Sequence, residues 1–147
     1  MSSAVVIDAI RTPIARADAR TGWFRDVRSD ELSAGLIGEL VGRTGIDPAL
    51  IEDVRWGCVQ QQGEQGYDIA RIAVLMAGLP IETGGVTVNR NCASSLQAIN
   101  DAAMSIVAGC EDVQIAGGVE HMHHIPIDKD YDPAPGLFHR YSEAIMH

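Results

Sequence analysis

Short apolar runs alternate with helix-like segments along the chain, and this alternation limits the possible folds more than any other feature. The runs are residues 4–10, 54–60, 86–88 and 113–116. Apolar residues at helical spacing fill the intervals between them. Strands that alternate with helices favour a mostly parallel sheet covered by helices on both faces. The sequence therefore predicts an α/β fold.

Start and stop signals place the helices. Asp30 is expected to cap a helix that ends before Gly45, a second helix is expected from about Tyr67, and a third from about Asn91. In the first helix, the apolar residues that follow helical spacing are Leu32, Leu36, Ile37, Leu40 and Val41. From residue 121 onward the periodicity is lost and prolines accumulate. We expect an α/β core over residues 1–120, and over 121–147 the start of an irregular loop region above the active site.

Composition excludes several classes of protein. The 147 residues are 46% hydrophobic, which is enough for the core of one domain, and the formal net charge of −9 disfavours a nucleic-acid partner. No apolar run approaches the length of a membrane span, and no secretory leader is recognisable. The three cysteines lack a C-x-x-C pair and leave one thiol unpaired. These features predict a cytoplasmic protein without a membrane span.

Cys92 is the candidate nucleophile. It follows the β-branched run 86–88 and is expected in the first turn of the next helix. Unpaired backbone N–H groups and the helix dipole favour a thiolate there, and the Cys92 N–H would stabilise an oxyanion. A basic partner, commonly a histidine, would complete the activation, and Arg90 is a local contributor. The alternative is a packing cysteine, which is what we expect of Cys58 and Cys110.

Three other sets of polar residues need an interpretation. A zinc site at His121, His123 and His124 is disfavoured because no carboxylate or cysteine stands at ligand spacing, so no metal is expected. Glu120 has the chemistry of a general base, but an ion pair that holds its loop is the favoured interpretation. The arginines of residues 11–28 are expected to pair with neighbouring aspartates in a solvated loop.

Several short motifs occur together and in a fixed order. They are Val6-Ile7-Asp8-Ala9-Ile10-Arg11-Thr12-Pro13, Phe24-Arg25-Asp26-Val27-Arg28, Trp56-Gly57-Cys58-Val59-Gln60-Gln61, Glu64-Gln65-Gly66, Val88-Asn89-Arg90 with Cys92, and Gly117-Gly118-Val119-Glu120-His121-Met122. In this order they are specific, and the whole chain resembles the amino-terminal part of the thiolases, most closely the 3-ketoacyl-CoA thiolases of fatty-acid β-oxidation.

The resemblance implies a thiolase-like fold and an activity. In the family the cysteine that matches Cys92 attacks the keto carbon of a 3-ketoacyl-CoA, releases acetyl-CoA, and yields an acyl-enzyme that coenzyme A cleaves. Met122 and His123 would contact coenzyme A or cover the acyl tunnel. Coenzyme A and acyl-CoA would be substrates, with no permanently bound cofactor. The family also implies a homodimer through residues 83–89, or a dimer of such dimers, and allows a β-oxidation multienzyme partner.

Departures from the family pattern leave alternatives open. The family motifs Asn-Glu-Ala-Phe, Gly-His-Pro and Cys-x-Gly do not occur in this chain, so a carboxy-terminal half or split subunit would have to supply them. The final strand of the amino-terminal half is not recognisable either. Asn91 and Ala93 replace an apolar residue and a glycine, which bears on acyl chain length. A biosynthetic acetoacetyl-CoA thiolase and a non-catalytic acyl-CoA-binding subunit are the alternatives.

Overall fold

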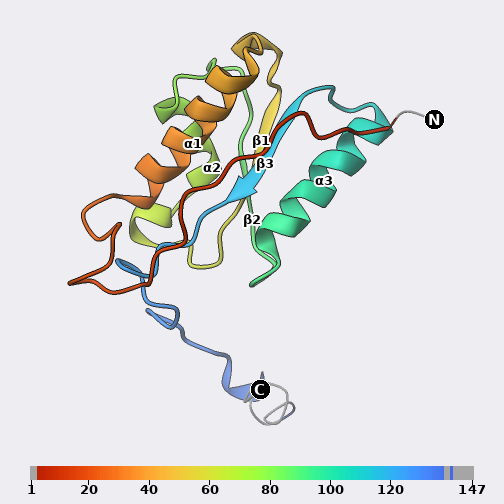
Figure 1. Cartoon of the computed structure of the whole chain (residues 1–147). Helices are drawn as coiled ribbons and strands as arrows, with labels where there is room; N and C mark the ends of the chain where they lie inside the picture. Colours follow the sequence, from red (N-terminus) through yellow and green to blue (C-terminus); the bar gives the residue numbers. More distant parts are fainter. Residues whose placement is uncertain (1–2, 138–139, 141–147) are drawn as a thin grey trace.

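A small parallel sheet lies between helices in the computed structural model, which describes residues 3–137 and 140 (Figure 1). The order of elements is α1 (Ser29–Thr44), η1 (Pro48–Leu50), β1 (Asp53–Gly57), η2 (Gly63–Gln65), α2 (Ile69–Met76), β2 (Val86–Val88), α3 (Ser94–Ala108) and β3 (Gln114–Gly118). Within the described residues the strand order is β2-β1-β3, and both pairings are parallel. The predicted α/β class is confirmed.

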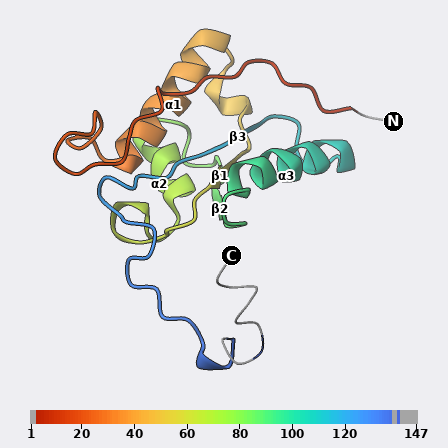
Figure 2. The same ribbon diagram turned by 60° about the horizontal axis from the view of Figure 1, so that its bottom comes forward.

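Helices cover both faces of the sheet, as the alternating pattern predicts. Helices α1 and α2 lie on one face and α3 on the other (Figures 1 and 2). The core fills the space between β1, α1 and α2, where Ile37, Val54, Ile69 and Val74 are almost completely buried. Because strand side chains alternate in direction, Gly57 is left to face α3, and this glycine matters for the site.

The helix boundaries differ slightly from the predicted ones. Asp30 does not cap α1 but lies in its first turn, where its carboxylate pairs with the guanidinium of Arg28 at 2.7 Å. The helix begins two residues earlier, with Arg28 as its N-cap, and the Ser29 N–H donates to the Glu64 carboxylate at 2.9 Å, a contact that local sequence does not encode. Gly45 ends α1 with a φ of 64°, as predicted.

Residues 4–10 form no strand, which contradicts the sequence prediction. The segment is extended, Val5, Val6 and Ile7 are exposed, and Asp8 is tied to Arg43 of α1 at 3.0 Å. Strand β1 pairs with β2 on one edge and β3 on the other, and residues 4–10 pair with neither outer strand of this sheet. The apolar pattern predicts a need for burial, but it does not say which strand a segment pairs with.

The remaining elements agree with the sequence to within a few residues. Strand β1 stops at Gly57, three residues before its predicted end, whereas β3 continues through Gly118. After β3 the chain is irregular as far as residue 134, and the segment after residue 126 extends away from the sheet (Figure 2). The expected helical tendency of residues 141–147 lies outside the described residues. Within the described part of the chain, no helix has the length and apolar character to cross a membrane.

Candidate active site

Three loops meet at the carboxyl edge of the sheet. Because all paired strands are parallel, the ends of β1 at Gly57, β2 at Val88 and β3 at Gly118 lie at the same edge. Ligands of open α/β sheets bind in the crevice outside the carboxyl ends of the strands. The loops that follow these strands carry most of the candidate residues predicted from the sequence.

Cys92 lies in a tight turn just before α3. The helix begins at Ser94 with Ala93 as its N-cap, so the prediction that Cys92 occupies the first helical turn is wrong by two residues. Asn91 adopts a left-handed φ of 49°, and the Ser94 hydroxyl accepts the Arg90 N–H at 2.8 Å, which together delay the helix. The Cys92 side chain is exposed in this turn. A non-glycine residue held in the left-handed region marks a strained position, and such positions cluster at active sites.

The start of α3 is pressed against the strand ends by two glycines. A Cβ atom on Gly57 would lie 2.4 Å from the backbone nitrogen of Ser95, and one on Gly118 would lie 2.2 Å from the Ser95 hydroxyl. Only hydrogen at these positions permits so close an approach. The small residues at 93–95 predict this close packing, and the structure confirms it. The result is that the Cys92 turn is fixed directly above the sheet.

Glu120 holds the neighbouring loop together. Its carboxylate accepts the backbone N–H of Val59 at 2.8 Å and of Gln60 at 3.2 Å, and also the amide of Gln65 at 3.0 Å. Glu120 therefore has the holding role predicted for it, but through N–H donors of the opposite loop rather than through an ion pair. Gln65 extends the network because its own oxygen accepts the His121 N–H at 2.6 Å.

Met122 and His123 line a cavity of about 280 Å³ between the loop after β3, the amino-terminal segment and α1. Trp56 and Leu36 contribute apolar surface to it. His123 is largely buried and its Nε2 has no hydrogen-bond partner among the described residues. Burial lowers the pKa of His123, and the neighbouring His121 acts in the same direction. Cys92 does not line this cavity, so the structure brings together two of the three predicted site residues.

Comparison with known proteins decides the family. The profile of the thiolase N-terminal domain matches residues 4–146. The chain belongs to the thiolase family. This thiolase chain is 52% identical over 145 residues to proteins named 3-ketoacyl-CoA thiolase from Shewanella denitrificans and Shewanella baltica, and 50% identical to one from Shewanella loihica. Each alignment covers 98% of this chain but only 37% of the relative's length.

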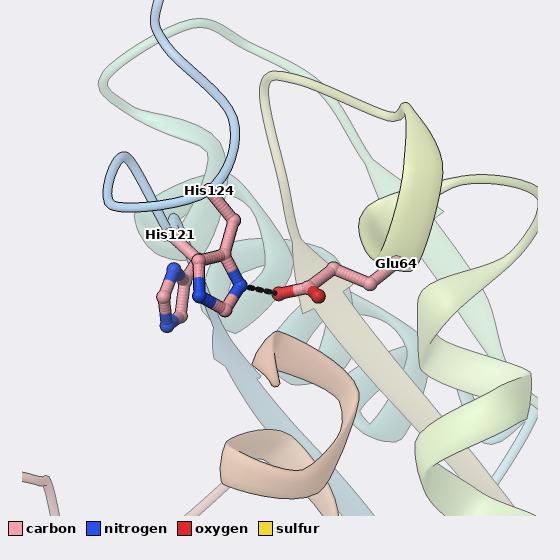
Figure 3. Close-up of side chains that lie close together, drawn as sticks. All are labelled: Glu64, His121 and His124. Atoms are coloured by element: carbon pink, nitrogen blue, oxygen red, sulfur yellow. Dashed lines mark hydrogen bonds and ion pairs between the residues drawn. The ribbon is translucent and has the colours of Figure 1, made fainter. Parts of the chain in front are cut away.

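Sequence reasoning missed one residue of the thiolase chain that stands beside the histidines. Glu64 of η2 lies within 2.9 Å of His124, measured from its Oε1 to Nδ1 (Figure 3). The Arg25 carbonyl and the Glu64 carboxylate raise the pKa of His124. Spacing could not reveal this pair because the two residues are 60 positions apart. The one available signal was the conspicuous Glu64-Gln65-Gly66 motif.

Cys58 and Cys110 differ from each other in exposure. Cys58 packs in the core beside Gln65, as predicted, whereas Cys110 is exposed just after the end of α3. The prediction of packing is therefore wrong for Cys110. Gly109 ends α3 with a φ of 73°, and this turn carries the next side chain out of the core.

We expect Cys58 to resist alkylation in the folded protein. Burial, assisted by the negative charge of Glu120, raises the pKa of the Cys58 thiol to about 12, so only about one thiol in 10,000 is ionised at pH 8. Iodoacetamide followed by peptide mass spectrometry should modify Cys110 and leave Cys58 unmodified. Denatured protein is the control, in which both should react. Equal labelling of Cys58 and Cys110 under native conditions would contradict this.

Proposed function

We propose that this chain supplies the nucleophile half of an acyltransferase that cleaves 3-ketoacyl-CoA with coenzyme A to acetyl-CoA and a shortened acyl-CoA. The observation that carries the proposal is the exposed Cys92, held in a strained turn at the carboxyl edge of a thiolase-family sheet. The Shewanella relatives bear the name of this reaction. Because the chain spans 37% of their length, the rest of the catalytic machinery is assigned to a carboxy-terminal half or split subunit.

The chemistry requires a soft nucleophile and donors for an oxyanion. The Cys92 thiolate would attack the keto carbon, and the bond between C2 and C3 would then break to release the acetyl-CoA carbanion, which takes up a proton. The acyl group would remain as a thioester on Sγ until the thiolate of coenzyme A attacks it. The Cys92 N–H, in the turn just before α3, would supply one donor for the developing oxyanion.

We propose that the site takes transient substrates and has no permanently bound cofactor. Coenzyme A and acyl-CoA would be bound transiently, with Met122 and His123 contacting them from the cavity described above. The free cysteines among the described residues favour a reducing compartment, and we place the reaction in the cytoplasm. Its degradative direction would make a β-oxidation multienzyme complex a natural partner.

Assembly is proposed through the edge of the sheet. Strand β2 is an edge strand, and an edge offers unpaired backbone groups to a second copy. Val86 at its start is partly exposed. A two-fold homodimer through residues 83–89, or a dimer of such dimers, would cover this edge and would lie directly beside the Cys92 turn.

The direct test is to trap the acyl-enzyme. The intact protein here means this chain together with its carboxy-terminal half or split subunit. When it is incubated with acyl-CoA in the absence of free coenzyme A, the acyl mass should be found on the peptide that contains Cys92. Cys92→Ala should abolish this adduct, whereas Cys110→Ala, the matched exposed cysteine, should retain it. Acylation of another residue would refute the role of Cys92. Tight acyl-CoA binding without any adduct would indicate a non-catalytic subunit instead.

A further inference from the structure

We propose that Glu64, His121 and His124 form a binding site for a divalent transition-metal ion, with Zn²⁺ as the preferred occupant. One ligand atom from each residue lies within 4.8 Å of the other two (Figure 3). The sequence disfavours a metal because no carboxylate or cysteine stands at ligand spacing from the histidines. The fold supplies that partner from η2, and the site is separate from Cys92.

Both imidazoles are oriented in the way that metal-binding histidines usually are. His121 Nε2 lies 3.2 Å from the carbonyl of Phe24, and His124 Nε2 lies 2.6 Å from the carbonyl of Arg25. A carbonyl only accepts, so each Nε2 carries the proton and donates it. Metal-ligating histidines almost always donate their second N–H to a carbonyl or carboxylate, which fixes the ring and the tautomer. Two consecutive carbonyls of one loop thus direct both Nδ1 atoms to the ligand role.

The two Nδ1 atoms have the environments that a metal site requires. His121 is 2% exposed, and its Nδ1 is buried without a hydrogen-bond partner among the described residues. A buried acceptor without a partner is uncommon in folded proteins, so it needs an explanation. His124 Nδ1 faces Glu64 Oε1 at 2.9 Å. Two ligands bound tetrahedrally at 2.0–2.2 Å to one zinc ion are about 3.4 Å apart, so these two atoms would separate by about 0.5 Å when the ion enters.

The third ligand is held in place before any ion binds. The Glu64 side chain is only 10% exposed, and its Oε1 also accepts the Ser29 N–H at 2.9 Å. The guanidinium of Arg28 is 3.8 Å from Glu64, but its shorter contact, at 2.7 Å, is with Asp30. The negative charge of Glu64 is therefore not taken up by Arg28 and is available to a metal ion. An entering ion would displace the proton between His124 and Glu64 and draw His121, whose ring centroid is 4.3 Å from that of His124, toward it.

The ligand set selects the class of metal and its role. Two imidazoles and one carboxylate suit Zn²⁺ and its transition-metal neighbours, whereas Mg²⁺ and Ca²⁺ prefer oxygen ligands throughout. Three protein ligands leave one tetrahedral position for water. The ion would fasten the loop after β3 to η2 and, through the Nε2 hydrogen bonds, to residues 24–25. Its role is to position this loop, which lines the cavity with Met122 and His123.

The test is metal binding by the intact protein after treatment with a chelator. Zn²⁺ titrated calorimetrically should bind with a stoichiometry of one per chain, and Co²⁺ should give the intense visible absorption of a tetrahedral site. His124→Gln and Glu64→Gln should each weaken Zn²⁺ binding by more than about 100-fold, since even loss of an outer-shell partner costs 10–100-fold. Glu82→Gln, at an exposed position outside the cluster, is the matched control, which should bind like the wild type.

The same titrations distinguish the proposed site from metal binding at a cysteine. Cys92→Ala should retain both Zn²⁺ affinity and the Co²⁺ spectrum, and circular dichroism should show that the two ligand variants are folded. A folded wild-type protein that binds neither ion at 50-fold excess over about micromolar protein would overturn the proposal. So would binding that survives both His124→Gln and Glu64→Gln, or a Co²⁺ spectrum that disappears with Cys92→Ala.

Discussion

Residues 1–147 alone are expected to show no measurable cleavage of 3-ketoacyl-CoA, although Cys92 is present. Positioned acid and base groups contribute about 10²–10⁴-fold to a rate, and the loss of one oxyanion donor costs about 10²–10³-fold. Under the proposed function, these groups belong to the part of the relatives that the chain does not match. The measurement is the loss of the keto-thioester absorbance of acetoacetyl-CoA, or of a longer substrate, in the presence of coenzyme A.

A chimera provides the positive control. When this chain replaces the aligned part of the Shewanella denitrificans relative, turnover should return, and Cys92→Ala in the chimera should abolish it. The isolated chain should also self-associate in sedimentation experiments, because α3 exposes Leu96, Ile99 and Met104 on its surface. Turnover by the isolated chain at the rate of the chimera would show that the two-part site is unnecessary.

Gly57→Ala should have the largest effect on folding of any single methyl group added to this sheet edge. The new Cβ would lie 2.4 Å from the Ser95 nitrogen and 2.6 Å from the Ser94 carbonyl carbon, and both are backbone atoms that no rotamer change can move. We expect the free energy of unfolding to fall by about 3 kcal/mol or more, at the upper end of the range for overpacking. Urea denaturation of the intact protein measures this change.

Gly38→Ala is the matched control for Gly57→Ala. Gly38 lies inside α1, and no atom outside its helix stands within 4 Å of where its Cβ would be. This substitution should stabilise the protein by about 0.5–1 kcal/mol, because alanine loses less conformational freedom than glycine in a helix. Equal unfolding midpoints for the two variants would mean that α3 is not held against Gly57 as described.

The sequence predicts the architecture well because the relevant signals are local. Alternating apolar runs, Gly45 after α1 and Gly109 after α3 are each encoded within a few residues, and the elements appear within a few residues of where those signals place them. Pairing partners are not local information. The apolar pattern of residues 4–10 therefore predicts a strand, although in the described structure this segment pairs with no strand of the sheet.

The candidate site shows the same difference between local and long-range information. A cysteine between a strand and a helix is visible in the sequence, but its exact relation to the helix depends on the Ser94 hydroxyl and the left-handed Asn91. Glu64 is a stronger example, since only the folded chain shows that it stands beside His124. Side chains that are far apart in the sequence but adjacent in the fold leave no periodic pattern in the sequence. The prediction of Cys92 was therefore possible, whereas that of the Glu64 cluster was not.

Glu120 places a negative charge at one end of the carboxyl edge of the sheet. The N–H groups of Val59 and Gln60 would otherwise form a concave anion trap at the end of β1, but the carboxylate already occupies them. At the end of β1, a phosphate group would therefore find these two N–H donors already bound, and the negative charge of Glu120 would repel it. The end of β2 and the start of α3 carry no such internal anion in the contacts described. One acidic side chain thus makes the end of β1 an unfavourable place for an anionic group.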